Sequence, residues 1–296
     1  MFVDFLISFV LALVMFTIGS SLKPGQFMAV AKRPKAVALG LALQMLFLPL
    51  MTFSLVNLFP LAVEFKIGLM IVSFCPGGTT ANLVNYLLDT DVPLSIYLTS
   101  INSFLILATV PFFTYLAIYH FTGSSDHIHL PVGATIVKVV LVILAPVMLG
   151  MWIRRIWPKL VIILQRPLKY SSIILLAAIF IIKFLAPSAQ GGSGIVMAEI
   201  FEILPMALTM HFTAMVLSYY LAKGVLSNHK SCVTIAVEVG LQNTTLALLI
   251  TSTLIGNEEM AKPALVYALF SFFTTFAYGF LTKRFGKIHR LTQTSE

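Results

Sequence analysis

The sequence has 296 residues, of which 59% are hydrophobic and 10% charged, and its formal net charge is +8 at pH 7. Soluble domains carry about 25% charged residues, so this composition excludes an ordinary soluble protein. The excess of positive charge does not indicate a nucleic-acid partner, because the basic residues stand in short clusters between long apolar stretches. The pattern is typical of an all-α polytopic membrane protein, whose first partner is the lipid bilayer.

Nine apolar stretches are long enough to cross a bilayer as helices, which takes about 20 residues each. They lie at residues 2–20, 36–59, 66–88, 92–119, 131–153, 168–187, 198–222, 231–255 and 263–282. The first stretch lacks a basic start and a clear cleavage site, so we expect a span rather than a signal peptide. The connections are short. We therefore predict one integral membrane domain over residues 1–296 with nine transmembrane helices.

Basic residues gather in the loops after the first, fifth, seventh and ninth predicted spans, which hold most of the 19 lysines and arginines. Positive residues favour the cytoplasmic side, so we predict an outside N-terminus and a cytoplasmic C-terminus. The other lysines, Lys66, Lys138, Lys183 and Lys262, lie near the opposite ends of spans. Asp89 and Asp91 follow the third span at a membrane end, where we expect a solvated turn and a helix cap rather than a metal motif.

Two predicted spans contain residues that destabilise a continuous helix near its middle. The third contains CPGG at residues 75–78, and the eighth contains EVGLQN at residues 238–243. Proline removes a backbone donor, and glycine costs about 1 kcal/mol relative to alanine in a helix. Unwound backbone at membrane depth is tolerated only where it is buried in protein or lines a cavity. We therefore predict two discontinuous helices.

The two interruptions occupy corresponding positions in approximate repeats over residues 1–120 and 165–285. The displacement is five spans, an odd number, so the matching helices run in opposite directions. Paired interruptions in an inverted repeat are the best sequence indication of a transporter's binding site. The fifth span has no partner, as if one helix of a symmetrical ten-helix plan were absent.

Glu238 is the only acidic residue well inside a predicted span. A carboxylate there costs several kcal/mol unless it is paired, which makes Glu238 a candidate functional residue. A structural pairing with His211, in the middle of the seventh span, is the alternative, because no lysine or arginine lies at a comparable depth.

Neutral oxygen-bearing residues stand where they could join Glu238 in a cation site, since hard cations take carboxylate, amide, hydroxyl and carbonyl ligands. Serine and threonine in membrane helices often bond to their own backbone, so hydroxyls are weaker candidates than amides. The candidates are Asn82 after the first interruption, Ser95 and Thr99 at positions i and i+4 of the fourth span, Gln44 in the second span, and Gln242 and Asn243 in the second interruption.

The second half of each interrupted span predicts the charge of the substrate. These halves begin near Thr79 and Thr80 and near Asn243. A helix start presents free N–H groups and a partial positive charge, which favour an anionic group. A small organic anion bound beside cations is therefore the expected substrate.

At the two interruptions the sequence resembles the bile acid:sodium symporter family, in its bacterial branch. The matching segments are CPGGTTANLVNYLLDTDVPLSIYLTS (residues 75–100) and EVGLQNTTLALLI (residues 238–250), with weaker support from SLKPGQF (21–27) and PALVYALFS (263–271). The resemblance implies two inverted five-helix repeats divided into core and panel domains, here without the first helix. It also implies a multi-pass protein of the bacterial inner membrane.

The resemblance further implies two sodium ions coupled to uptake of an organic anion. The first sodium site would use Asn82, Ser95, Thr99 and Glu238, and the second Gln44, Glu238, Gln242 and the carbonyls of Val239 and Leu241. Substrate would meet Thr79, Thr80 and Asn243, and Thr274 in the last span. Ala81 stands where the family commonly has serine, which removes a hydroxyl from the first site. Phe273, Thr274 and Thr275 replace a His-Asn pair of bacterial relatives, which disfavours bile acid itself.

The leading hypothesis is sodium-coupled symport of a small organic anion, bile-acid-like or a carboxylate, by alternating access. Proton coupling at Glu238 is the alternative within transport. A passive channel would not need paired interruptions around one acid. An enzyme would need a nucleophile with a base or a cluster of metal ligands, and the spans contain no HExxH, GxSxG or paired acidic motif. We therefore expect no enzymatic activity, and nothing in the sequence indicates an oligomer.

Overall fold

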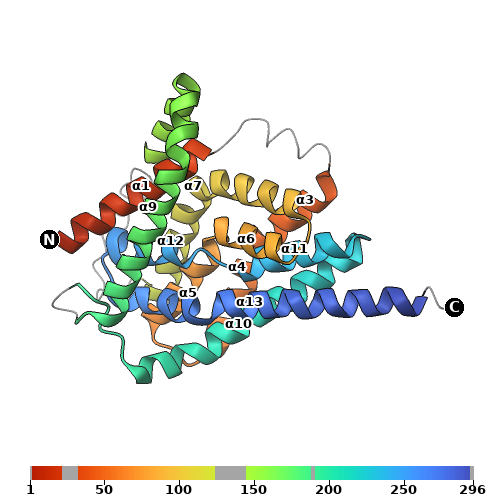
Figure 1. The fold of residues 1–296 in the computed structure, drawn as a ribbon. Coiled ribbons are helices and arrows are strands. Elements are labelled where there is room, and N and C mark those ends of the chain that lie inside the picture. Colours follow the sequence, from red (N-terminus) through yellow and green to blue (C-terminus); the bar gives the residue numbers. More distant parts are fainter. Residues whose placement is uncertain (1, 22–32, 124–144, 188–190, 294–296) are drawn as a thin grey trace.

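The computed structural model describes residues 2–21, 33–123, 145–187 and 191–293, and within these ranges the chain is helical with no strand (Figure 1). The helices are α1 (Phe2–Ser21), α3 (Pro34–Ala42), the π-helix η2 (Leu43–Phe47), α4 (Leu48–Leu58), α5 (Val63–Phe74), α6 (Thr79–Leu87), α7 (Val92–Thr122), a helix over residues 145–156, α9 (Pro158–Leu185), α10 (Met197–Val225), α11 (His229–Gly240), α12 (Thr244–Leu249), the π-helix η4 (Ile250–Ile255) and α13 (Glu258–Gln293). The all-α prediction is confirmed.

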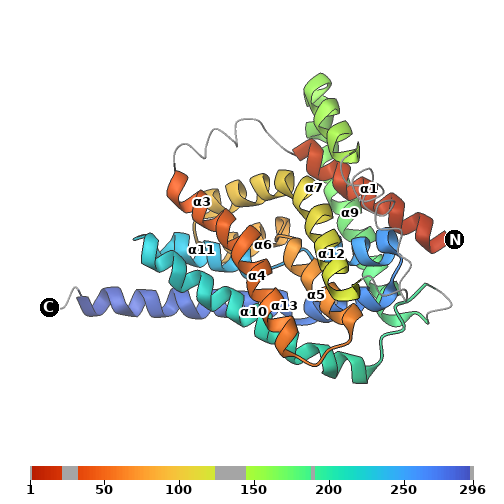
Figure 2. The same ribbon diagram turned by 180° about the vertical axis from the view of Figure 1, so that it is seen from behind.

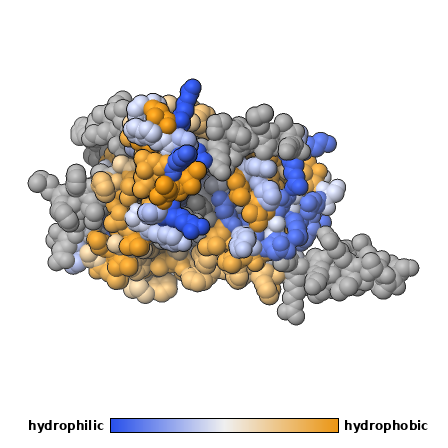
Figure 3. Space-filling model, turned by 45° about the horizontal axis from the view of Figure 1, so that its top comes forward, coloured by the Kyte–Doolittle hydropathy of each residue, from blue (hydrophilic) through white to orange (hydrophobic). Residues whose placement is uncertain are grey.

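Five helical segments of the described chain are long and apolar enough to cross a membrane, and the bent helix α7 makes a sixth. Hydrophobic residues cover much of the surface seen in Figure 3, while hydrophilic residues gather in separate patches. The polytopic character is thus confirmed. The count of nine stays a prediction, because the first part of the fifth predicted span, up to residue 144, lies outside the described residues.

Both predicted interruptions are present. Residues 75–78 separate α5 from α6, and residues 241–243 separate α11 from α12. The two unwound segments lie against each other, since the N–H of Asn243 donates to the carbonyl of Cys75 at 2.8 Å. Gly77 makes this approach possible, because a Cβ there would lie 2.2 Å from the Leu241 carbonyl oxygen. Each break therefore satisfies part of the other's backbone.

The helices that carry the breaks lie at the centre of the molecule. In the span His229–Ile255, 83% of the most apolar segment is buried, against 20–44% in the other four long spans. Helix α5 contacts α4, α7 and α13, and α11 packs along α10 (Figure 2). The breaks are therefore enclosed by protein.

Two distortions were not predicted, and each has a proline nearby. Helix α7 bends by 60° at Leu107, one turn before Pro111, whose ring crowds the carbonyl four residues earlier. The second predicted span widens into η2 just before Pro49, which has no N–H for the helical ladder. Such π-bulges occur often at functional sites, and η2 carries Gln44.

Helix α1 packs beside α9 at one side of the molecule (Figure 1). It also meets the helix over residues 145–156 at two glycines. A Cβ at Gly19 would lie 2.2 Å from the Val147 carbonyl oxygen, and one at Gly150 would lie 2.4 Å from the Phe16 carbonyl oxygen. Small residues at such contacts let membrane helices approach closely. α1 also contacts α12 and η4, so this group of helices borders the second break.

The burial of Asp91 differs from the prediction of a solvated turn. It caps α7 as expected, accepting from the N–H of Leu94 at 3.4 Å. Its side chain is only 7% exposed, however, and its other oxygen accepts from Arg33 at 2.5 Å and Ser231 at 2.7 Å. The prediction of a solvated residue is therefore wrong for Asp91. Asp89 is exposed as expected and pairs with Lys230 at 3.0 Å.

Because the two breaks lie so close together, we expect Gly77→Ala to lower the stability of the protein strongly. The added methyl group would press on the Leu241 backbone, which cannot rotate away, and such overpacking costs about 1–3 kcal/mol. We expect a clearly lower Tm of the detergent-solubilised protein. Gly224→Ala in α10 is the matched control, because a Cβ there would meet no atom of the described residues within 4 Å. Equal melting temperatures for the two variants would contradict the close approach.

Candidate functional site

Glu238 lies in the last turn of α11 and is 2% exposed. Its Oε1 accepts from the hydroxyl of Ser95 at 2.5 Å and from the amide of Asn85 at 3.3 Å. Its Oε2 accepts from the hydroxyl of Thr99 at 3.3 Å. Within the described part of the chain these hydrogen-bond partners are all neutral, so the carboxylate's charge is not balanced by a basic side chain.

Asn82, in the first turns of α6, faces the same two hydroxyls. Its Oδ1 lies 2.6 Å from Ser95 Oγ and 3.1 Å from Thr99 Oγ1. Each hydroxyl has one proton but faces two acceptor oxygens, one from Asn82 and one from Glu238. With the amide oxygen of Asn82 oriented this way, two close oxygen pairs have no proton between them. A cation placed among these oxygens would relieve that contact.

Asn85 also belongs to this group of side chains, although it was not among the residues predicted from the sequence. This fully buried amide donates to Ser95 Oγ at 3.1 Å as well as to Glu238, and its own Oδ1 accepts from Thr90 at 2.7 Å. It lies three residues after Asn82, so both amides share one face of α6. That spacing was the signal in the sequence that could have identified it.

Ala81 packs against apolar neighbours although it lies one turn before Asn85 on α6. It is fully buried in a small apolar cluster between α6 and α11 that includes Val84, Val233 and Val237. The missing hydroxyl that the sequence indicated therefore corresponds, in this structure, to apolar packing.

The residues of the predicted second cation site are also brought together in part. The amide of Gln44 in η2 donates to Gln242 Oε1 at 3.1 Å, and the amide of Gln242 donates to the Val239 carbonyl at 2.6 Å. The oxygen of Gln44 is buried and has no hydrogen-bond partner among the described residues. An unsatisfied buried amide oxygen is a suitable cation ligand. The Leu241 carbonyl lies beside Gly77, at the place where residues 75–78 and 241–243 meet, which we call the crossing.

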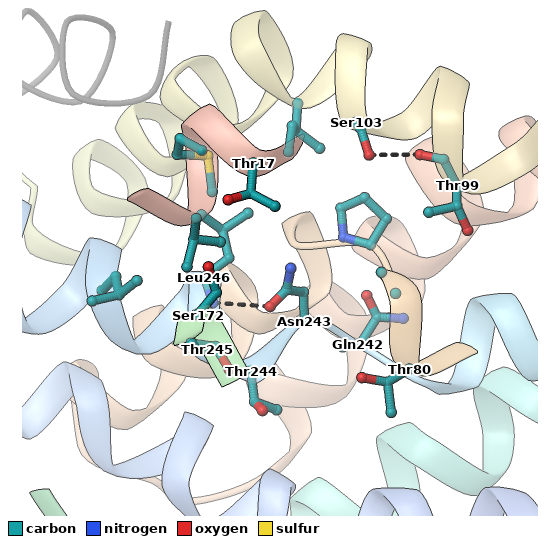
Figure 4. A pocket seen from close by; sticks show the side chains of 17 residues that line it. Thr17, Thr80, Thr99, Ser103, Ser172, Gln242, Asn243, Thr244, Thr245 and Leu246 are labelled. Carbon is teal, nitrogen blue, oxygen red and sulfur yellow. Dashed lines mark hydrogen bonds between the residues drawn. The ribbon is translucent and has the colours of Figure 1, made fainter. Parts of the chain in front are cut away.

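A cavity of about 330 Å³ lies beside the crossing (Figure 4). It is bounded by both breaks and also by α1 and α9. Its polar lining consists of Thr17, Thr80, Thr99, Ser103, Ser172, Gln242, Asn243, Thr244 and Thr245. Asn243 caps α12 by accepting from the N–H of Leu246 at 3.0 Å, as the dashed line in Figure 4 shows. The cavity thus adjoins both candidate cation sites through Thr99 and Gln242.

The residues predicted to contact substrate do not all lie at the cavity. Thr80 and Asn243 line the cavity, and the side chain of Thr79 lies outside the described residues. Thr274 does not line the cavity; its hydroxyl lies 2.8 Å from Nε2 of His211. The alternative pairing of His211 with Glu238 is not formed, because His211 Nδ1 faces the Gly240 carbonyl at 3.1 Å.

Comparison with known proteins finds similarity to one family of transporters. Residues 8–192 match the model of the sodium bile acid symporter family. The chain is 28% identical to the ileal sodium/bile acid cotransporter of Oryctolagus cuniculus, covering 89% of this chain and 75% of the relative. It is 24% identical to the uncharacterized sodium-dependent transporter YocS of Bacillus subtilis, covering 80% and 70%.

A third relative is a probable sodium/metabolite cotransporter, chloroplastic, of Oryza sativa subsp. japonica. It is 29% identical, and the match covers 79% of this chain but only 55% of that protein. All three relatives are described as transporters rather than enzymes.

The crowding of acceptor oxygens predicts that Glu238→Gln stabilises the sodium-free protein. The new amide would supply protons to the oxygens of Asn82, Ser95 and Thr99 and would remove an unbalanced buried charge. We expect Tm in choline buffer to rise by a few degrees, since each kcal/mol is worth roughly 2–4 °C for large domains. Glu202→Gln, an exposed residue of α10, is the control and should leave Tm unchanged. A lower Tm for Glu238→Gln would contradict the crowding.

Proposed function

Because the chain belongs to the sodium bile acid symporter family, we propose that it is a secondary active transporter that couples sodium to the movement of a small organic anion by alternating access. The observation that carries this proposal is the convergence of oxygens from Asn82, Ser95 and Thr99 on the buried Glu238, beside a cavity at the crossing of two broken helices.

We assign two sodium positions that share the Glu238 carboxylate. The first uses Asn82, Ser95 and Thr99 with Asn85 orienting the carboxylate. The second uses Gln44, Gln242 and the carbonyls of Val239 and Leu241. The second assignment is supported by the contact from Gln44 to Gln242 and by the Gln44 oxygen, which has no hydrogen-bond partner in the part of the chain that the structure describes. One carboxylate serving two cations makes binding of the second ion depend on the first.

We assign the substrate to the cavity beside the crossing. The first turn of α6 and the capped start of α12 both border it, and helix starts favour negative charge. Thr80 and Asn243 supply polar contacts there. The volume of about 330 Å³ is near the lower end of ligand pockets, which span about 300–1,000 Å³. A compact carboxylate therefore fits this state of the site better than a steroid.

In this proposal the protein spans a bacterial inner membrane with nine helices in two inverted repeats, its N-terminus outside and its C-terminus in the cytoplasm. The contacts of Arg33 with Asp91 and of Lys230 with Asp89 support the topology, because all four residues are predicted to lie on the cytoplasmic side. Helices α1 and α9 would belong to the panel domain, and the helices around α5 and α11 to the core domain.

The proposal predicts that sodium stabilises the purified protein and equimolar potassium does not, because the site is built from closely spaced hard ligands. Glu238→Ala should abolish the difference between the two salts. Glu202→Ala, which removes an exposed carboxylate of α10, should preserve it. The measurement is Tm in detergent over a series of sodium concentrations at constant ionic strength. Equal melting temperatures of the unmodified protein in the two salts would refute sodium coupling.

Proton coupling at Glu238 is the second candidate. It is favoured by the contact of 2.5 Å between Ser95 and the carboxylate, since a proton on Glu238 would also relieve the crowded oxygens. Uptake of a radiolabelled carboxylate into proteoliposomes separates the two candidates. Sodium coupling predicts accumulation driven by a sodium gradient at equal pH. Accumulation driven by a pH gradient in sodium-free buffer would favour the proton instead.

A further inference from the structure

The Gly240 carbonyl receives two hydrogen bonds from side chains of other helices. Tyr267 in α13 donates its hydroxyl at 2.6 Å, and Nδ1 of His211 in α10 lies 3.1 Å away. Helix α11 ends at this residue, so its last carbonyls have no intrahelical partner. Both side chains are fully buried. The break in α11 is therefore anchored to two neighbouring helices at one carbonyl.

The imidazole of His211 is held in a defined position. Thr274 Oγ1 lies 2.8 Å from its Nε2, and the rings of Tyr267 and Phe270 contact it edge-on with centroids 5.4 Å away. With a proton on Nδ1, His211 donates to the Gly240 carbonyl and Nε2 accepts from Thr274. The Tyr267 hydroxyl also lies 2.9 Å from Nδ1, so the two side chains that meet the Gly240 carbonyl contact each other as well.

Gly240 itself lies flush against α10. A Cβ at this position would lie 2.2 Å from Cγ of Met215. The backbone is thus pressed onto α10 on one side and bonded through its carbonyl to Tyr267 and His211. The contact with Met215 and the hydrogen bonds to the carbonyl together fix the peptide plane between residues 240 and 241.

That peptide plane lies between the two carbonyls assigned to the second sodium. The Val239 carbonyl precedes it and accepts from Gln242, and the Leu241 carbonyl follows it and lies beside Gly77. Neighbouring peptide planes share a Cα atom, so only φ and ψ of the linking residue separate their orientations. Fixing the Gly240 carbonyl therefore limits the directions that the two adjacent carbonyls can take.

We propose that Tyr267 and His211 are positioning residues for the second sodium site, which act by holding the Gly240 carbonyl so that the carbonyls of Val239 and Leu241 face the ion. This inference rests on the proposed sodium coupling. Thr274 belongs to the same network through its contact with His211.

The test is Tyr267→Phe, which keeps the ring and removes the donor. We expect the sodium concentration for half-maximal stabilisation to rise about five- to tenfold, the effect of one lost hydrogen bond. A purely structural role would lower Tm equally at every sodium concentration and leave that midpoint unchanged. The measurement is a sodium titration of Tm in detergent, at constant ionic strength.

Tyr278→Phe is the matched control. This tyrosine is on the same helix, and its hydroxyl bonds the Met215 carbonyl of α10 at 3.5 Å rather than a carbonyl of the break. It should change the midpoint less than twofold. An equal shift in both variants would overturn the proposal, and so would an unchanged midpoint in Tyr267→Phe.

Two variants of His211 provide a second measurement if Tyr267→Phe does not fold. Glutamine can still donate a hydrogen bond to the Gly240 carbonyl, whereas leucine cannot. We expect His211→Leu to raise the sodium midpoint and His211→Gln to restore most of the affinity. Identical midpoints in the two variants would overturn the proposal.

A double-mutant cycle locates the effect at one sodium site. Combined with Gln44→Ala, Tyr267→Phe should add less than its own shift, because both act on the second site. Combined with Asn82→Ala, which reaches the second site only through the shared Glu238, Tyr267→Phe should keep more of its own shift than it does with Gln44→Ala. The reverse pattern would overturn the assignment to the second site.

The same titrations distinguish an error in the proposed sodium coupling from an error in the positioning role. If the unmodified protein shows no sodium-specific stabilisation, sodium coupling is wrong and the positioning role falls with it. If the unmodified protein responds to sodium and Tyr267→Phe responds with the same midpoint, only the positioning role is wrong.

Discussion

The hydrogen bond from the N–H of Asn243 to the carbonyl of Cys75 joins the two unwound segments, and the rest of the structure depends on this contact. Backbone that leaves a helix at membrane depth must find its partners within the protein. Here the two breaks are partners of each other, and Gly77 removes the one side chain that would hold them apart. The oxygens around Glu238 and the cavity beside it exist because these two irregular segments meet.

The same arrangement explains how a carboxylate can be buried when its hydrogen-bond partners among the described residues are all neutral. Glu238 is surrounded by neutral hydroxyls and amides that contribute oxygens but few protons. A lysine or arginine in that place would neutralise the site permanently. Neutral ligands instead leave the negative charge to be balanced by an ion that arrives and departs, as the proposed sodium-coupled transport requires. The permanent ion pairs, such as Lys262 with Glu199 at 2.6 Å, lie near the ends of helices.

The sequence predicted the features that have strong local signals. Proline and glycine at residues 76–78 and the isolated Glu238 located both breaks, and the i,i+4 spacing of Ser95 and Thr99 predicted their shared target. Long-range contacts could not be predicted in this way. Asn85 resembles any polar helix residue until α7 and α11 are placed beside it, and the burial of Asp91 depends on Arg33 from a distant loop. The π-helix at Gln44 depends on packing as well as on Pro49.

The bond between the two breaks also has a consequence for biosynthesis. Cys75 is in the first half of the chain, and Asn243 is about 170 residues further on. At a synthesis rate of about 5–20 residues per second, the first broken helix must wait roughly 10 to 30 s for its partner. Until then its open backbone depends on water or on the insertion machinery. The candidate site is thus among the last parts of this protein to form, because the first broken helix lacks this partner until most of the chain has been made.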